Sequence, residues 1–228
     1  MSHWWKYPIS DVLPFSLRSY YRLLESYGQE FWLLYALSFI SGLVIIWRLT
    51  RFSRLDIRIT LLYVAVGWAL VAWLFFHRSY SSLFWAAPYF AIAFAAQCLV
   101  LAVMALLAPG AAVSRAGPPR CKLGAALFAL VLLAYPLAGF VLAAAPAFAE
   151  GFAMTPDPTA IGTLAILSAM QGRLRWIAMV IPLVWSLVST VILWNLGSAL
   201  ATAIPVLCAL AIIAALAPDK DTNHTDYR

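Results

Sequence analysis

Long apolar stretches separated by short polar segments dominate the chain. A membrane-spanning helix needs about 20 mostly apolar residues, and six stretches approach or exceed that length: 31–48, 58–76, 84–108, 123–144, 174–194 and 196–217. A seventh, shorter apolar stretch covers residues 159–170. The pattern therefore predicts an all-α integral membrane helical bundle with about seven transmembrane helices.

The segment before the first apolar stretch has a different, amphipathic pattern. Ser16 is a plausible N-cap, and the apolar and aromatic positions recur at helical spacing: Leu17, Tyr20, Tyr21, Leu24 and Tyr27. We expect an N-terminal interfacial helix that lies in the membrane surface with its aromatic face among the headgroups. The alternative is a lid over a site between the spans.

These elements divide the chain into three parts. Residues 1–30 form an N-terminal tail and the interfacial helix, residues 31–217 form the transmembrane bundle, and residues 218–228 form a polar C-terminal tail. The composition supports this division, since 64% of the residues are hydrophobic and only 11% are charged.

The basic residues lie in short segments between apolar stretches, which argues for membrane topology and against nucleic-acid binding. If all seven stretches cross the membrane, eleven Lys and Arg residues fall on one side and four on the other. Cytoplasmic loops carry the basic excess. The N-terminus is therefore expected outside and the C-terminus in the cytoplasm, with the lipid bilayer and membrane proteins as the expected partners.

Few polar side chains occur within the spans, whose central parts contain no charged residue. Gln97 and Asn195 are the strongest candidates for a functional role there. The alternative for both residues is a hydrogen bond between helices, worth around 1 kcal/mol or less.

The expected outer face carries a more distinctive set of side chains. One external loop provides His77, Arg78, Tyr80 and Trp85, and the next provides Glu150 and Asp157. A solvated rim with an aromatic belt explains this set best. If the protein binds a ligand, however, these residues are the expected site.

Cofactor and metal sites receive no support from the sequence. Only three histidines are present, and His3 and His224 lie in the terminal tails. Three separated cysteines indicate neither a disulfide framework nor a zinc site. We therefore expect no cofactor and no metal.

The short stretch at residues 159–170 begins with a helix-start signal. Asp157 can cap a helix that begins at Pro158, because proline in the first turn loses only an unpaired amide. A helix from there to Met170 would be about 20 Å long, which is too short to span alone. Either the preceding residues GFAMTP enter the membrane as irregular backbone shielded by protein, or the bilayer is locally thinned.

Three segments carry a resemblance to a known family: PFSLRSYYRLLESYGQEFW, WLFFHRSYSSLFWAAPYF and TPDPTAIGTLAILSAMQGRLRWIAMVIPLVWSLVST. They resemble an uncharacterised bacterial family of polytopic inner-membrane proteins, known only as a domain of unknown function. The resemblance implies a whole-chain membrane domain in the bacterial inner membrane and supplies no activity. Many members of that family carry Cys before the Pro-Thr pair, where this chain has Asp157, so no thiol or metal role carries over.

Three functional hypotheses follow. The first is a non-enzymatic accessory or scaffold subunit of a membrane assembly, based on the absence of buried charge and of a catalytic constellation. The second is a transporter or channel for a small neutral or anionic solute, admitted between Arg78, His77 and the helix start at Asp157. The third is an intramembrane enzyme that uses His77 with Glu150 or Asp157 as acid and base, although no nucleophile or metal set accompanies them.

Overall fold

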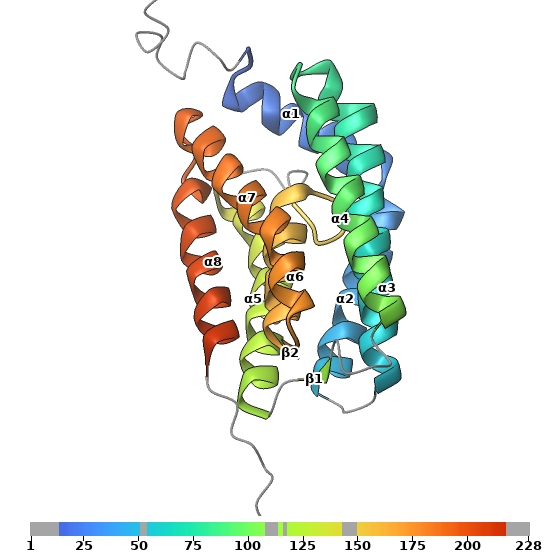
Figure 1. Cartoon of the computed structure of the whole chain (residues 1–228). Helices are drawn as coiled ribbons and strands as arrows, with labels where there is room; N and C mark the ends of the chain where they lie inside the picture. The colour runs from blue at the N-terminus through green and yellow to red at the C-terminus, as the bar shows by residue number, and fades with distance from the viewer. Residues whose placement is uncertain (1–13, 51–53, 108–113, 116–117, 143–149, 218–228) are drawn as a thin grey trace, which may run out of the picture.

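The computed structural model describes residues 14–50, 54–107, 114–115, 118–142 and 150–217. These residues form a helical bundle with one short strand pair (Figure 1). The elements in chain order are α1 (Leu17–Glu30), α2 (Trp32–Thr50), α3 (Arg54–Leu70), η3 (Val71–Ser79), η4 (Tyr80–Ser82), α4 (Ala87–Leu107), β1 (Ser114–Arg115), α5 (Pro118–Leu142), α6 (Pro156–Ser168), β2 (Met170–Gln171), α7 (Leu174–Asn195) and α8 (Leu200–Leu216). The tails at 1–13 and 218–228 lie outside the described residues.

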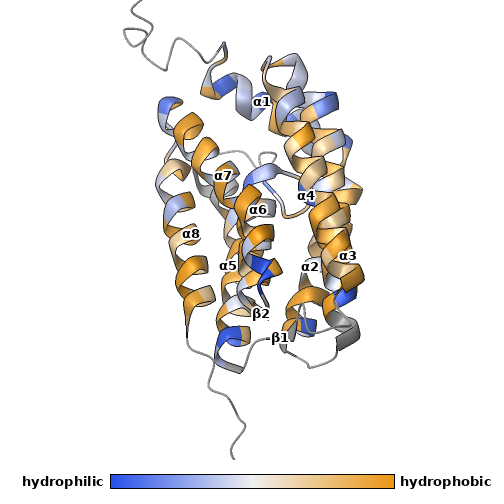
Figure 2. Cartoon of the chain, viewed as in Figure 1, coloured by the Kyte–Doolittle hydropathy of each residue, from blue (hydrophilic) through white to orange (hydrophobic). Residues whose placement is uncertain are grey.

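Five helical segments are long and apolar enough to cross a membrane: Trp32–Leu49, Ile57–Ser82, Ala87–Leu107, Pro119–Leu137 and Leu174–Asn195. Hydrophobic residues cover most of these helices (Figure 2), and many of their large apolar side chains are exposed. Such a surface suits contact with lipid rather than water. The seven full spans expected from the sequence are not clearly present, because α8 is a shorter apolar helix and α6 has only 13 residues.

The short helix α6 lies in the interior of the bundle. It packs against α3, α5, α7 and α8, and every residue from Glu150 to Met170 is buried. A helix with apolar residues around its whole circumference has no face to present to solvent, so burial among other helices is its stable environment. At residue 162 only glycine fits, because an added Cβ would lie 2.7 Å from the ring of Phe152.

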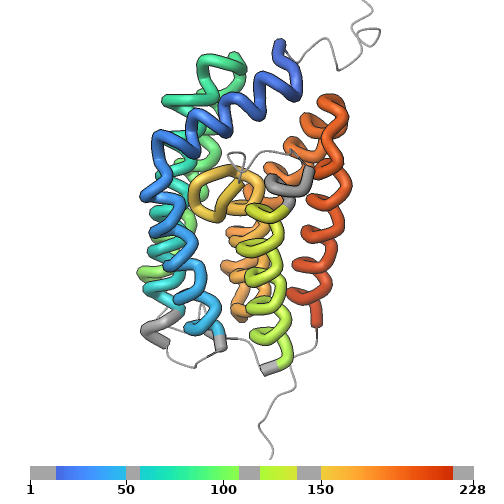
Figure 3. Tube along the Cα trace, turned by 180° about the vertical axis from the view of Figure 1, so that it is seen from behind, coloured from blue at the N-terminus to red at the C-terminus, as the bar shows by residue number. Residues whose placement is uncertain are grey.

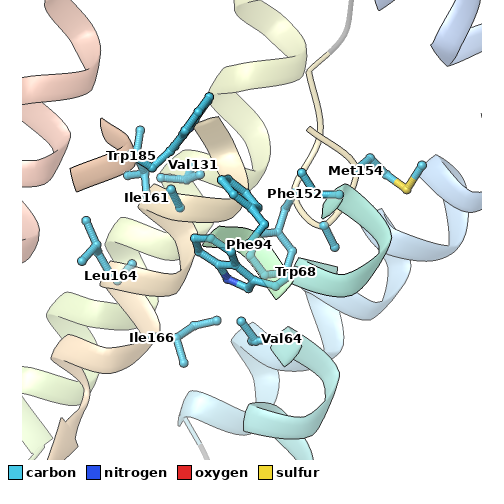
Figure 4. Close-up of a cluster of buried hydrophobic side chains, with 14 of the residues drawn as sticks. Val64, Trp68, Phe94, Val131, Phe152, Met154, Ile161, Leu164, Ile166 and Trp185 are labelled. Atoms are coloured by element: carbon cyan, nitrogen blue, oxygen red, sulfur yellow. The ribbon is translucent and has the colours of Figure 1, made fainter. Parts of the chain in front are cut away.

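A cluster of aromatic side chains fills the space around α6 (Figure 4). The Trp68 indole donates a hydrogen bond to Thr163 Oγ1 at 2.8 Å, and its ring centroid lies 4.3 Å from that of Phe94. Phe94 in turn packs edge-on against Trp185 at 5.2 Å. These contacts connect α3, α4 and α7 with the central helix.

The expected N-terminal helix is present as α1. Ser16 caps it, accepting a hydrogen bond from the Ser19 backbone N–H at 3.3 Å. Its buried face consists of Tyr20, Leu24 and Tyr27, and it runs obliquely across one end of the bundle before the chain continues into α2 (Figure 3). The expectation that this aromatic face contacts lipid headgroups is wrong, because these side chains pack against the protein.

The chain between α3 and α4 contains a stretch of π-helix, η3. Its wider turns bring Val71, Phe75, Phe76 and Tyr80 to the buried side, and the Tyr80 backbone N–H reaches back to the carbonyl of Phe75. Single π-turns often occur at functional sites. Here the π-helix delivers Tyr80 to the start of α6, where the candidate site lies.

Candidate functional site

The backbone that precedes α6 is irregular, and side chains organise it. Thr155 Oγ1 accepts from the Gly151 N–H at 3.0 Å, and Thr159 Oγ1 accepts from the Ala153 N–H at 2.8 Å. Ser38 of α2 donates to the Phe152 carbonyl. Ala153 has a φ of 63°, an uncommon conformation for a residue with a side chain. These hydrogen bonds pair backbone N–H and C=O groups of the turn, whose burial without a partner would be costly.

Helix α6 begins two residues earlier than expected. Thr155 is the N-cap and Pro156 is the first helical residue, so the expectation that Asp157 caps the helix is wrong. Proline at the first position still explains the start, because that amide has no helical partner. The carboxyl of Asp157 is free to make contacts outside its own helix.

Asp157 and Glu150 are buried together inside the bundle. Each residue is only 3% exposed. The Tyr20 hydroxyl of α1 donates to Glu150 Oε1 at 3.2 Å, and the Trp185 indole of α7 donates to Asp157 Oδ1 at 2.8 Å. The solvated rim expected for these two carboxyls is therefore wrong, because the loop that carries them folds inward.

The surroundings of this carboxyl pair favour the protonated forms. Burial, and to a smaller extent the nearby Asp157 carboxyl, raise the pKa of Glu150 to about 8, although the Tyr20 hydrogen bond opposes both effects. Burial also raises the pKa of Asp157, against opposing contributions from Ser189 and Trp185. Two neighbouring carboxyls out of water cannot both ionise easily, so the pair is suited to hold a proton near neutral pH.

A small cavity of about 20 Å³ adjoins the pair. Its lining includes Tyr20, Tyr80, Trp185 and Ser189. This volume corresponds to roughly one water molecule. Tyr20 and Trp185 thus link the cavity to the carboxyls through their hydrogen bonds.

The opposite end of α6 carries two buried guanidinium groups. Arg120 donates to the carbonyls of Ser168 and Met170 at 3.4 and 3.2 Å. Arg175 donates to the Met170 carbonyl at 2.6 Å and to the Ala215 carbonyl at 3.0 Å. Acidic residues at the start of a helix and basic residues at its end both complement the helix dipole. We assign these arginines a structural role at the end of α6.

The structure brings only part of the expected site together. Tyr80 lies close enough to Asp157 to interact with it electrostatically, and Glu150 forms a pair with Asp157. Arg78 instead forms an ion pair with Glu30, and both side chains are about half exposed.

The other expected residues lie apart from the pair. His77 is exposed and stacks on Trp73, with ring centroids 4.6 Å apart, and Trp85 is 66% exposed. Gln97 donates across to the Ala178 carbonyl of α7 at 2.8 Å. Asn195 donates to Val191 of its own helix. Gln97 thus makes a hydrogen bond between helices, which was the alternative to a functional role for this residue.

Four aromatic residues of the site were not identified from the sequence: Tyr20, Tyr35, Tyr135 and Trp185. Tyr20 was expected only as part of an amphipathic face. Trp185 lies near the middle of α7, and nothing in the sequence pairs it with an acidic loop residue. Among the described residues, no group of three or more His, Cys, Asp or Glu side chains could hold a metal ion.

A family model covers residues 17–222 and describes a family of unknown function, DUF6064. The chain belongs to this family. The match includes α1, the carboxyl pair and all the helices of the bundle, so the site lies within the family domain. No curated protein and no solved structure matches the chain.

Proposed function

We propose that this member of the family is a membrane transport protein in which Glu150 and Asp157 bind and release a proton during transport. The observation that carries the proposal is the burial of two carboxyls that have no basic partner among the described residues. Tyr20 and Trp185 donate hydrogen bonds to them, and the Ser189 hydroxyl also interacts with Asp157. None of these three groups carries a compensating charge.

The cost of burying ionisable groups supports a functional role for the pair. An isolated buried carboxylate is strongly disfavoured and takes up a proton instead. Ionisable groups inside a membrane bundle mark proton or ion pathways so often that function is the default hypothesis. A purely structural bundle would be more stable with apolar side chains at these two positions.

The backbone at the site provides a second argument for transport. Transporters commonly bind ions and substrates where a helix starts or stops within the bundle. Helix α6 starts in such a place, and the irregular residues before it are enclosed by protein. The carboxyl pair favours a neutral or cationic transported solute over an anion.

We further propose a location in the bacterial cytoplasmic membrane, with α1 at the outer surface. The basic residues that flank the helices support this orientation, because those in the described part of the chain lie in excess at the helix ends opposite to α1 (Figure 1). The hypothesis of a scaffold subunit rested on the absence of buried charge, which Glu150 and Asp157 contradict.

The test is a measurement of proton flux in vesicles that contain the full-length protein and an internal pH dye. A panel of neutral and cationic solutes is added outside, and the internal pH is followed. We expect at least one solute to drive a proton flux in wild-type vesicles, and we expect Glu150→Gln and Asp157→Asn to abolish it. Glu25→Gln, on α1, is the control. Wild-type flux equal to that of protein-free vesicles for every solute would contradict the proposal.

A further inference from the structure

Several buried polar atoms near the carboxyl pair have no hydrogen-bond partner. Four buried side-chain atoms of this region are unpaired in the described part of the chain: the hydroxyls of Tyr27, Tyr35 and Tyr135, and Glu150 Oε2. Buried polar atoms are nearly always paired with protein or with ordered water. Hydroxyls without a protein partner are suited to hydrogen bonds with bridging water.

Two of these tyrosines are neighbours. The ring centroids of Tyr27 and Tyr35 lie 6.1 Å apart, at an angle of 74°. Tyr35 also lies against the backbone next to Glu150, because a Cβ added at Gly151 would lie 2.9 Å from its ring. The Tyr35 hydroxyl interacts electrostatically with both Tyr27 and Glu150. The three side chains thus form a series from α1 through α2 to the carboxyl pair.

The outer end of this series reaches the surface. Glu30, the last residue of α1, interacts electrostatically with Tyr27, and its side chain is 48% exposed. Tyr27 itself is 2% exposed. A proton at Glu30 is therefore in contact with solvent, whereas one at Tyr27 is already inside the bundle.

We propose that protons travel between the α1 end of the bundle and Glu150 along a relay formed by Tyr27 and Tyr35, with water molecules bridging their hydroxyls. The proposal rests on the proposed function, because it supplies the route to the carboxyl that binds the proton. The acceptor at the inner end is Glu150 Oε2, since Oε1 already accepts from Tyr20.

Each step of the relay is balanced. A hydronium ion in the solvent beside Glu30 gives a proton to a bridging water, which gives one of its own to the Tyr27 oxygen. Tyr27 releases its hydroxyl proton to the next water, Tyr35 repeats the exchange, and Glu150 Oε2 receives the last proton. No tyrosine changes its net charge. Burial raises the pKa of Tyr27 well above its usual value, so hopping through neutral hydroxyls is favoured over a tyrosinate.

Tyr20 provides a competing route. It also bonds to Glu150, and it lines the small cavity beside Tyr80. Its hydroxyl proton already points to Oε1, however, so a relay through Tyr20 would first have to reverse this bond. The Tyr27 and Tyr35 hydroxyls have no such competing partner.

The experiment uses the full-length protein in lipid vesicles and time-resolved infrared spectroscopy of the carboxylic C=O band after a pH jump. Loss of a band in Glu150→Gln identifies the signal of that residue. Tyr27→Phe and Tyr35→Phe remove the relay hydroxyls and keep the rings. We expect each to slow the protonation of Glu150 on the order of 10²-fold, with the pH of half-protonation little changed. Tyr63→Phe, whose hydroxyl bonds to Ser41 of α2, is the matched control.

The outcomes separate the two proposals. A wild-type protein without a titrating Glu150 band would overturn both the proposed function and the relay. A titrating band that relaxes at the wild-type rate in Tyr27→Phe and Tyr35→Phe would overturn the relay alone, and slowing only in Tyr20→Phe would assign the route through the cavity. If one relay variant fails to fold, the other still decides, since removal of either hydroxyl interrupts the route.

Discussion

The carboxyls of Glu150 and Asp157 are met by neutral donors from other helices. Tyr20 reaches Glu150 from α1, and Trp185 reaches Asp157 from α7. A hydrogen bond to the charged form lowers a carboxyl pKa and burial raises it, and at both residues burial is the larger effect. These donors therefore hold the carboxyls in place without fixing them in the charged state. A group that must bind and release a proton needs this balance.

The indole of Trp185 provides a prediction at the scale of one residue. Trp185→Phe keeps an aromatic ring but removes the donor to Asp157, leaving a buried carboxyl oxygen unpaired. We expect a loss of about 1–3 kcal/mol in the free energy of unfolding, measured by denaturant titration in detergent micelles. Trp194→Phe, at a position 68% exposed, should change little. An equal loss from Trp185→Phe in a chain that already carries Asp157→Leu would show that the hydrogen bond is not the cause.

At the scale of elements, α6 is unusual because it is short and enclosed on all sides. Its length of 13 residues corresponds to about 20 Å. Pro156 and Pro158 have no amide N–H to leave unpaired in its first turn, and the two buried arginines donate to the carbonyls of Ser168 and Met170 at its other end. The chain can therefore start and end a helix within the bundle with few unpaired groups at the helix termini.

The packing of α6 predicts the effect of enlarging Gly162. Gly162→Val would push against the rings of Phe152 and Phe128, which lie 2.7 and 3.1 Å from the position of an added Cβ. Overpacking of this kind costs about 1–3 kcal/mol. We expect a lower thermal unfolding midpoint, measured by the loss of circular dichroism on heating. Ala209→Val, on the exposed side of α8, is the control, and equal shifts for the two variants would argue against a closely packed α6.

At the scale of the whole molecule, the buried pair couples stability to pH. Glu150 has a pKa of about 8 in the folded protein and an ordinary value of 4.5, so the folded state binds more protons between these two values. Stability is then greatest below pH 4.5 and falls as the pH rises toward 8. The groups that face Glu150 are Asp157, Tyr20, Tyr35 and Tyr135. Of these, only Asp157 ionises in or near this range.

This coupling predicts a pH-dependent free energy of unfolding. The free energy should fall by at most about 1.4 kcal/mol per pH unit and per carboxyl across that range. Glu150→Gln, which stays neutral, should flatten most of the dependence, and adding Asp157→Asn should remove the remainder. Denaturant titrations at several pH values measure this pH dependence of the free energy of unfolding. A wild-type stability that rises from pH 5 to pH 8 would have the wrong sign for a buried, protonated pair.

Periodicity and segment length are local properties of the chain, so they were sufficient to predict the helical architecture and the apolar character of the bundle. The cap at Ser16, the helix α1 and the helices in all seven apolar stretches followed from such signals. The resemblance to a family of unknown function was also confirmed. The number of spans was less well determined, since length alone cannot tell whether a short apolar helix crosses a membrane or lies within a bundle.

The positions of the buried carboxyls became known only from the three-dimensional fold. Glu150 and Asp157 stand in a polar, proline-containing segment that resembles a surface loop, and a local pattern carries no information that this segment folds inward. Burial depends on contacts between residues far apart in the chain, such as Tyr20 with Glu150 and Trp185 with Asp157. The same holds for Tyr35 of α2, whose ring lies against Gly151 and contacts Tyr27 of α1 only because α1 crosses the end of the bundle.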